Sequence, residues 1–474
     1  MNAPVTLRRV LKFRTVVSTS TGLAYAAISL LGCVQLASYV GGDSGWIAIL
    51  IAALLAMLAA LCFSELNAIY PTAAAIRLYM KEAFSDNFSL TITFGYMLTI
   101  IAVIAADSYI VGSAITYAFG LPNWASLIWI LALLGLAMGA NLRGIKLAGI
   151  LQDITTYTLL LAAIVISLIA LSKHNFQLHA PFDAINHPFD LVNAVAVGVF
   201  VFSAFEWVTP LSEEITNIKL IPRGMFISLG LLFISYALYT VASSHLLNVH
   251  NAQIANSPYP QLLLGQAALG QAGLWFMLIA TLLTAVMTFN GGFATASRFL
   301  YATAREGVLP PAFARISVSY AVPYVPVIVL TVLSALIAVI IFLTGQFQIL
   351  ILVGAVLEAL IYTVAGLCVI QLRRRQPATE RSFRIAGGWT IPIATIVIFG
   401  VLGLLASLGI GTGTAGILPG SPLIITIVLF ALSALYVYLY VPRLRAAAEA
   451  RRITTKRRRP GRQVETEKPE ITGL

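Results

Sequence analysis

The chain has 474 residues, of which 59% are hydrophobic and 10% are charged, and its formal net charge is +11. A soluble globular protein carries about 25% charged residues, and a surface so poor in charge would expose large apolar patches that aggregate in water. The composition therefore excludes a soluble fold. It indicates an integral membrane protein, with the lipid bilayer as its surrounding medium.

Twelve apolar runs follow one another along the chain. A helix needs roughly 20 apolar residues to cross a bilayer core about 30 Å thick. We therefore predict an all-α membrane protein with 12 transmembrane helices. Their approximate ranges are 15–39, 45–70, 88–119, 122–142, 148–171, 190–214, 223–246, 266–303, 324–344, 347–371, 388–410 and 422–442.

The basic residues give the expected orientation. If the N-terminal segment 1–14 is cytoplasmic, twelve spans place every Lys and Arg on that side except Lys173, as the excess of positive charge in cytoplasmic loops requires. We therefore expect a multi-pass protein of the cell (plasma or inner) membrane with both termini cytoplasmic and a transmembrane domain over 15–442. The basic segment 443–474 is expected to be a disordered cytoplasmic tail attracted to anionic lipids rather than a nucleic-acid binder.

Four acidic residues fall inside the apolar runs. An ionisable group in hydrocarbon normally faces a cavity or a partner. Asp153 lies near the cytoplasmic start of the fifth run, where the positive end of a helix accounts for it, and Glu358 is either structural or part of a binding site. Asp107 and Glu206 lie near mid-depth with no Lys or Arg at similar depth. Each is a candidate to hold a substrate ammonium group, a coupling cation or a proton.

Two runs are interrupted by small and hydroxyl residues. The first holds Ser18–Gly22 followed by Ala26–Ser29, and the sixth holds Ser203 and Ala204 followed by Pro210. Such residues form close helix-packing faces. They also occur where a helix breaks and its freed backbone groups bind substrate and ions. The pattern by itself leaves both interpretations open.

Several segments resemble the amino acid–polyamine–organocation (APC) superfamily of transporters, in particular the amino acid permeases. The resemblance extends over about 15–440. The segments that carry it are Phe202–Glu206 with Ser212–Asn217 and Ile221–Arg223, then Ala296–Tyr301 with Ala304–Pro310, then Cys62–Leu66 with Pro71, and Arg381–Arg384.

The resemblance implies a LeuT-like fold of two inverted five-helix repeats with broken helices 1 and 6. It places the helix-6 break near Ser203 and Ala204, assigns Phe200 and Phe202 to an aromatic gate, and makes Glu206 the family's helix-6 glutamate. The helix-1 break is expected near Ala27, Ile28 and Ser29, where freed backbone groups would meet a substrate carboxylate.

Four segments depart from the family pattern, the first being the helix-1 break, where the family's Gly-Ser-Gly is not legible. Ala204 replaces the helix-6 glycine, and Ala73–Ala75 stands where a Ser-Gly-Gly follows Pro71 in the family. The helix-5 lysine of some proton-coupled members is missing from Thr156–Leu159. Sodium coupling, another proton carrier and uncoupled exchange therefore all stay open, with Thr284 and Thr288 as candidates for a sodium-like site.

The sequence thus predicts a secondary active transporter of amino acids or related amines that works by alternating access. Its substrate-binding residues are expected among Ala27, Ile28, Ser29, Asp107, Phe200, Phe202, Ser203, Ala204, Glu206 and Glu358. Two deep acids without a deep base favour a cationic substrate, such as a polyamine or a basic amino acid, although a buried acid can equally be protonated or structural. We expect no catalytic residues, no metal and no cofactor besides a coupling H⁺ or Na⁺. A membrane-embedded enzyme or a channel is the remote alternative.

Overall fold

The computed structural model describes residues 9–40, 44–173, 188–247, 254, 257–408 and 420–447. Within these ranges the chain is helical and contains no strand, apart from an isolated bridge between Leu11 and Ile215. The described helices that are long and apolar enough to cross a membrane number 11, or 12 when the bent pair α1 and α2 counts as one span. The predicted all-α membrane fold is confirmed.

The first half of the chain supplies α1 to α7. Their bounds are α1 (Phe13–Ala24), α2 (Ala27–Val40), α3 (Gly45–Ile69), α4 (Ile76–Ala83), α5 (Asp86–Ala118), α6 (Ala125–Leu142) and α7 (Ile145–Ser172). Most of these agree with the predicted runs to within a few residues, because apolar length alone determines where a span begins and ends. The short α4 follows Pro71 and is too short to cross the membrane.

The second half supplies the remaining helices. Their bounds are α8 (Pro188–Phe202), η2 (Phe205–Leu211), α9 (Leu220–Leu246), α11 (Pro260–Leu269), α12 (Gln271–Arg305), η3 (Pro311–Ala314), α13 (Tyr324–Thr344), α14 (Gln348–Arg375), α15 (Thr390–Leu408) and α16 (Ser421–Leu439). After α16, helical structure continues to Ala447, past the predicted boundary at 442. The rest of the predicted tail lies outside the described residues.

The predicted eighth run, 266–303, is wrong at its start. The chain forms two helices there, because Gly270 adopts a left-handed φ of +62° that ends α11 before α12 begins at Gln271. A glycine takes this conformation without the steric penalty of a side chain. The loop expected at 247–265 therefore contains part of a helix.

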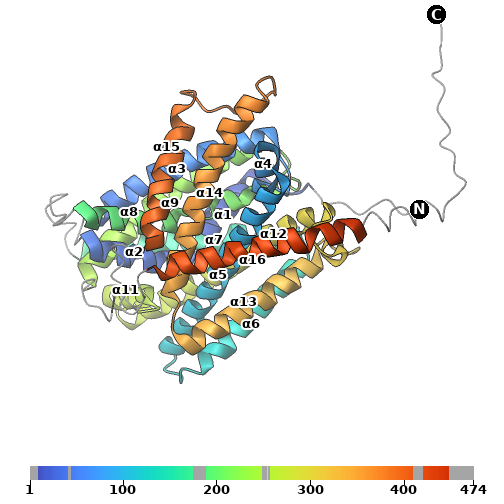
Figure 1. The fold of residues 1–474 in the computed structure, drawn as a ribbon. Helices are drawn as coiled ribbons and strands as arrows, with labels where there is room; N and C mark the ends of the chain where they lie inside the picture. Colours follow the sequence, from blue (N-terminus) through green and yellow to red (C-terminus); the bar gives the residue numbers. More distant parts are fainter. Residues whose placement is uncertain are drawn as a thin grey trace, which may run out of the picture.

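The helices form two groups, which meet around the middle of the molecule. The broken helix α1–α2, α3, α8 and α9 pack against one another, while α5 packs against α6, α12 and α13. Figure 1 shows α13 and α6 side by side below α16, and α14 beside α15. The broken pairs α1–α2 and α8–η2 open the two halves of the chain, as an inverted repeat of five helices requires.

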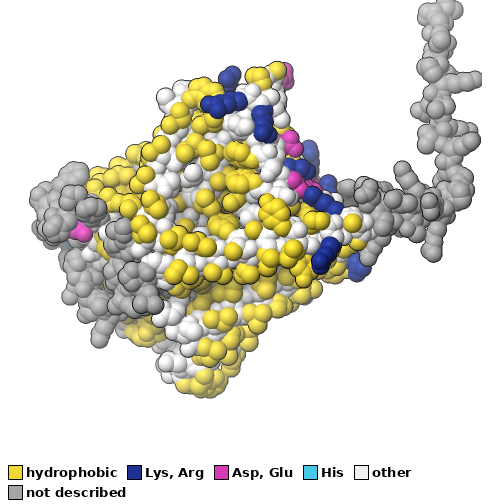
Figure 2. Space-filling model, viewed as in Figure 1, with side chains coloured by type: hydrophobic (Ala, Val, Ile, Leu, Met, Phe, Trp, Pro, Cys, Tyr) yellow, Lys and Arg dark blue, Asp and Glu magenta, His cyan; other side chains and the backbone are white. Residues whose placement is uncertain are grey.

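The molecular surface is divided between lipid-like and charged regions. Apolar side chains cover the visible lateral face, whereas Lys and Arg side chains gather toward one end (Figure 2). We call this the basic end; α4 and the loop between η2 and α9 lie there. Lateral apolar side chains such as Leu136 and Leu343 are 72% and 74% exposed, which is stable only against hydrocarbon.

Candidate functional site

Helix 1 breaks between Ala24 and Ala27, and the two pieces are bent by 55°. The break lies at Tyr25 and Ala26, so the expected position at Ala27, Ile28 and Ser29 was too late by two residues. Those three residues instead form the first turn of α2. The Tyr25 side chain is held outside the helical path, since its hydroxyl is hydrogen-bonded to Ser235 at 2.6 Å and its ring stacks on Tyr236 with centroids 5.0 Å apart.

Helix 6 breaks at the predicted position. α8 ends at Phe202, Ala204 adopts a left-handed backbone with φ +72°, and the 3-10 helix η2 starts at Phe205. An L-residue with a Cβ pays about 1–2 kcal/mol for this conformation. Ala75, the last residue of the segment that stands where the family carries Ser-Gly-Gly, also has a positive φ, +41°. Both departures therefore lie where the backbone favours glycine.

The two breaks are joined directly. The Ser20 hydroxyl of α1 donates a 2.8 Å hydrogen bond to the carbonyl of Phe205, which the break in helix 6 has freed. The carbonyl of Ala24 at the end of α1 accepts hydrogen bonds from Ser29 and from Tyr236, each at 2.7 Å. Freed backbone groups in a membrane must find such partners.

Asp107 of α5 lies against the start of α2. One carboxylate oxygen, Oδ1, accepts the backbone N–H of Ile28 at 3.0 Å. The side chain is fully buried, and its second oxygen, Oδ2, has no hydrogen-bond partner among the described residues. Thr288 of α12 lies beside the same carboxylate. The predicted residues Ile28, Asp107 and Thr288 are thus brought together from three helices.

An aromatic layer lies near this carboxylate on the side of Tyr236. Phe202 meets the Tyr236 ring edge-on with centroids 5.5 Å apart, while Tyr236 stacks on Tyr25. Phe200 is buried and packs on Gly354 of α14, where an added Cβ would lie 3.0 Å from its ring. The two phenylalanines expected to form a gate therefore both lie inside the protein beside the broken helices.

Glu206 forms a second polar cluster, with residues of α5 and α14. The hydroxyl of Tyr96 donates to one Glu206 oxygen, and that of Tyr362 donates to the other at 3.0 Å. Glu358 belongs to this cluster as well, since its Oε2 lies 3.5 Å from the same Tyr96 hydroxyl. All four side chains are buried. Within the described part of the chain neither glutamate forms an ion pair.

The two clusters lie at different depths. Asp107 and Tyr96 are eleven positions apart on α5, which at the α-helical rise corresponds to about 16 Å. The break in helix 6 connects them, since Phe202 precedes it in the Asp107 cluster and Glu206 follows it in the second. The two buried acids therefore lie at two levels of the helix bundle, on either side of the break in helix 6.

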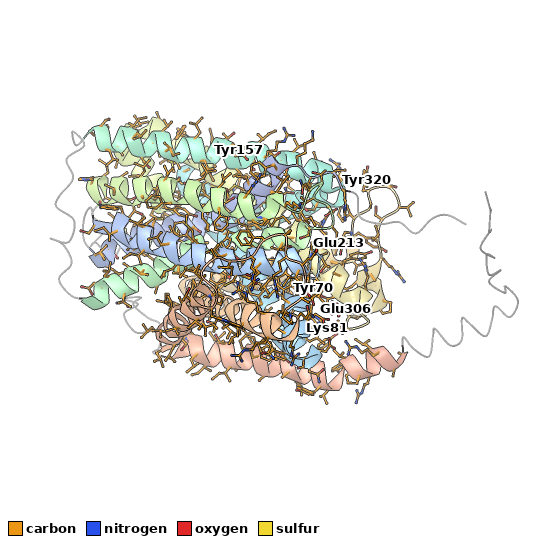
Figure 3. The ribbon with its side chains drawn as sticks, turned by 90° about the horizontal axis from the view of Figure 1, so that it is seen from above. Tyr70, Lys81, Tyr157, Glu213, Glu306 and Tyr320 are labelled. Carbon is orange, nitrogen blue, oxygen red and sulfur yellow. The ribbon has the colours of Figure 1, made fainter. Side chains whose placement is uncertain are left out.

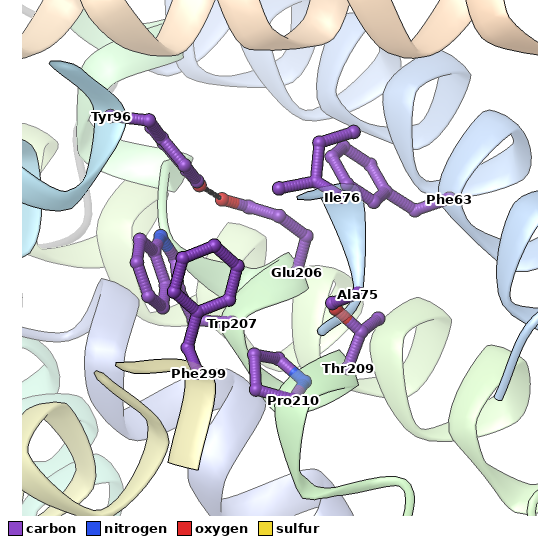
Figure 4. Close-up of a pocket in the computed structure, with 9 residues that line it drawn as sticks. All are labelled: Phe63, Ala75, Ile76, Tyr96, Glu206, Trp207, Thr209, Pro210 and Phe299. Atoms are coloured by element: carbon purple, nitrogen blue, oxygen red, sulfur yellow. Dashed lines mark hydrogen bonds between the residues drawn. The ribbon is translucent and has the colours of Figure 1, made fainter. Parts of the chain in front are cut away.

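A small pocket reaches Glu206. It has room for about one water molecule. Figure 4 shows Tyr96 bonded to Glu206 above Trp207 and Phe299, with Thr209 and Pro210 of η2 and Ala75 opposite. The pocket is far smaller than an amino acid. In this conformation a solute the size of an amino acid has no open route to the site along it.

The remaining candidate ion ligands lie apart from Glu206. The Thr284 hydroxyl donates to the Thr281 carbonyl of its own helix at 2.7 Å. Where the family's helix-5 lysine would stand, Thr156 and Gln152 donate hydrogen bonds of 3.1 and 3.3 Å to the Ser18 carbonyl. Neutral donors thus satisfy this carbonyl. Asp153 lies about two turns inside α7, so the helix end expected to account for it does not; it pairs instead with Arg14 at 2.8 Å.

The family-like segments meet in pairs at the basic end. Glu214 after η2 bonds Arg298 of α12, and both side chains are 1% exposed. Glu65 of α3 bonds Arg373 of α14 at 2.6 Å and pairs with Arg381 at 3.4 Å. Burial raises the pKa of the Glu214 carboxyl, and the adjacent Arg298 guanidinium opposes that rise. These ion pairs join α12 to the segment after η2, and α14 to α3.

A more exposed ring of contacts surrounds them. Glu306 contacts both Arg77 and Lys81, and Glu213 lies 3.4 Å from Arg305. Figure 3 shows Glu213, Glu306 and Lys81 on the same side of the bundle. Together the buried and exposed pairs close the basic end.

Tyrosines are the main site residues that the sequence-based prediction missed. Tyr96 and Tyr362 bind Glu206, while Tyr25 and Tyr236 bond Ser235 and the Ala24 carbonyl at the break in helix 1. Of these contacts, only the neighbourhood of Glu358 and Tyr362 could be predicted locally, because the two residues lie four positions apart on one helix face. The three cysteines are buried free thiols.

Comparison with known proteins identifies the family. The family model for amino acid permeases matches residues 11–441. The chain is a member of the amino acid permease family. The permease is 26% identical over 388 residues to the human Asc-type amino acid transporter 1, covering 77% of this chain and 72% of that protein. It is 27% identical to the rabbit (Oryctolagus cuniculus) large neutral amino acids transporter small subunit 2 over 71% of this chain and 64% of the relative.

A solved structure supports the fold. A manganese transporter from Eremococcus coleocola superposes on the permease with a TM-score of 0.63, over 94% of this chain and 99% of that one, at 13% identity. At this identity the likeness shows a shared fold. The relatives are transporters and not enzymes, so the predicted class, a secondary transporter, is confirmed.

Proposed function

We propose that the permease moves amino acids or related amines across the membrane, binding them between α1–α2, α5, α8–η2, α12 and α14. The observation that supports this most is the meeting of both helix breaks with buried carboxylates, since Ile28 bonds Asp107 and Glu206 follows Ala204. Broken helices at mid-membrane are how transporters with inverted repeats create a binding site. The relatives named as amino acid transporters support the same substrate class.

Transport proceeds by alternating access. The group that contains α1–α2 and α8–η2 moves against the group built on α5 and α12, and the site opens to each face in turn. The conformation described here has its basic end closed by Arg298–Glu214 and the surrounding pairs. These pairs must separate when the site opens toward that end. Water can replace the partner of an exposed charge at little cost. The buried Arg298–Glu214 pair can separate only when the opening also brings water to both side chains.

We propose that a proton, and not sodium, is the coupling ion and that Glu206 and Glu358 carry it. The two tyrosine hydroxyls both donate to Glu206, so Glu358 lacks a full donor, and its Oε1 has no partner among the described residues. Two neighbouring carboxylates without a cation repel each other. A single shared proton removes that repulsion and supplies the missing donor. The water-sized pocket at Glu206 supports entry of a proton.

The orientation is part of the proposal. Both termini lie in the cytoplasm and the basic end faces it, in agreement with the distribution of Lys and Arg. Reporter fusions at each terminus test this, since a periplasmic or extracellular signal from either end would overturn it.

A counterflow assay tests the function. Purified permease in proteoliposomes loaded with unlabelled amino acids and amines should accumulate the labelled compound transiently and saturably, and a pH gradient should drive uptake where a sodium gradient does not. Flux that never saturates would indicate a channel, and chemical change of the compound would indicate an enzyme. Sodium-driven uptake at equal pH would reject the proton proposal alone.

A further inference from the structure

The first turn of α2 already holds a carboxylate. Helix N-termini attract anions, because their backbone N–H groups are unpaired and the helix dipole is positive there. In this permease the Ile28 N–H donates to Asp107, a side chain of the protein itself. The feature that would bind a substrate carboxylate is therefore occupied from within.

The same carboxylate has spare capacity for a ligand. Asp107 is fully buried, and the described structure gives it no ion pair. Its Oδ2 has no hydrogen-bond partner among the described residues, although the Thr288 side chain lies beside the carboxylate. A buried anion with an unused oxygen is costly unless a positive group or a donor meets it. An ammonium group offers three donors and a compensating charge. Oδ2 thus provides the acceptor and the negative charge that an ammonium group needs.

The surroundings suit an organic cation. The stacked rings of Tyr25 and Tyr236, with Phe202 edge-on to Tyr236, lie beside the start of α2. Aromatic faces attract ammonium groups and also bury the carbon chain that carries them. Among its described residues this aromatic layer has no Lys or Arg side chain. It therefore offers nothing to neutralise the carboxylate of a bound amino acid.

We infer that the transported solute is an amine without an α-carboxylate, with Asp107 taking the place of that group. This rests on the proposed function and names its substrate class more closely. An α-amino acid entering the site would bring its carboxylate toward a fixed anion that already occupies the helix end. The two negative charges would repel each other, and this repulsion selects against the amino acid. An amine without the carboxylate meets only the attraction between its ammonium group and Asp107.

Matched pairs of solutes test the inference on the unmodified protein. Each pair is an amino acid and the amine that differs by the carboxylate alone: lysine and cadaverine, arginine and agmatine, phenylalanine and phenethylamine, serine and ethanolamine. In proteoliposome counterflow the amine of the best-transported pair should exceed its amino acid by at least about tenfold, following the preference that a fixed charge imposes. An amino acid preferred over its amine would overturn the inference and leave the proposed function standing. No saturable counterflow with any compound would reject the proposed function itself.

Two variants add a reciprocal test. Asp107→Asn keeps an oxygen for Ile28 but removes the charge, and it should lower amine counterflow at least about tenfold. Asp107→Gly frees the start of α2 and should raise counterflow of the matching amino acid above the wild-type value. Ser108→Ala is the control, since its hydroxyl bonds only the Ala105 carbonyl of its own helix. Unchanged amine counterflow in a folded Asp107→Asn protein would overturn the inference.

Discussion

The Asp107 carboxylate on α5 accepts the Ile28 backbone N–H at the first turn of α2, with 3.0 Å between the two atoms. This contact joins the two helix groups at the break in helix 1. It also places a negative side chain where the backbone is most positive. The geometry links the fold to the choice of solute, because the break that creates the site also creates the anion position that Asp107 fills.

Replacing Glu358 with Gln should separate exchange from accumulation. Glutamine keeps the shape and the hydrogen bonds but cannot release a proton, so counterflow should persist while accumulation driven by a pH gradient falls at least about tenfold, as for other essential proton-carrying groups. The measurement is uptake with and without an imposed gradient of either polarity. Asp153→Asn is the matched control, because that buried acid already pairs with Arg14. Equal accumulation by Glu358→Gln and wild type would rule out the shared proton.

Loss of the Tyr362 hydroxyl should weaken the same cluster. Tyr362→Phe removes the 3.0 Å donor to Glu206 and leaves an acceptor oxygen buried without it, which costs about 1–3 kcal/mol. We expect a shift in the pH dependence of transport together with lower thermal stability. Replacing Tyr438, whose side chain is 64% exposed, with Phe should change neither. A pH profile identical to wild type in Tyr362→Phe would contradict the assigned role.

Glycine should have opposite effects at two positions near the helix-6 break. Ala204→Gly removes left-handed strain of about 1–2 kcal/mol, in part offset by the greater freedom of glycine in the unfolded chain. Ala194→Gly, inside the regular α8, should instead destabilise by about 1 kcal/mol. Melting temperatures of the two purified variants give the comparison. If both fall by a similar amount, Ala204 is not strained.

Separating the buried pair at the basic end should open the pocket. In Glu214→Gln/Arg298→Gln both charges are removed, so no buried charge is left alone, whereas the single variant Glu214→Gln strands Arg298 at a cost of about 3–5 kcal/mol. A cysteine at Thr209, which lines the pocket, should then react several-fold faster with a membrane-impermeant thiol reagent. The three native cysteines are buried and give little background.

The exposed pair supplies the control for that experiment. Glu213 and Arg305 are 28% and 53% exposed and 3.4 Å apart, and such pairs contribute only about 0–1 kcal/mol. Glu213→Gln should therefore leave the labelling rate near that of the wild type. Equal rates in the double variant and in this control would show that Glu214–Arg298 does not hold the basic end closed.

The spans were predictable because hydrocarbon acts on each helix separately. The run predicted at 324–344 coincides with α13, Tyr324–Thr344, since only local apolarity and length determine its bounds. The eighth run failed at its start, because a single glycine with positive φ divides an otherwise continuous apolar stretch. Hydropathy does not register backbone conformation.

The helix breaks show where local reasoning ends. Ala204 was placed correctly by resemblance to the family motif, although the sequence has no glycine there. The break at Tyr25 was placed two residues too late, because its cause is a set of contacts with Ser235 and Tyr236, some 210 positions away. No pattern near Tyr25 encodes those contacts.

Separation along the sequence also explains which site residues were identified and which were missed. Asp107 and Glu206 were identified because an acid in an apolar run is conspicuous. The tyrosines that bind Glu206 were not, because a tyrosine in such a run is an ordinary membrane residue. Tyr96 meets Glu206 only once α5 and η2 are packed together. The partners are therefore properties of the fold and not of any segment.

Equilibrium binding of the best counterflow substrate to detergent-purified permease tests the central claim most directly, that the solute binds at the helix breaks against Asp107. Calorimetry should give a Kd for Asp107→Asn at least about tenfold above that of the wild type, corresponding to about 1.4 kcal/mol, while Ser108→Ala keeps the wild-type value. A folded Asp107→Asn protein that binds the same solute with unchanged Kd would contradict the claim.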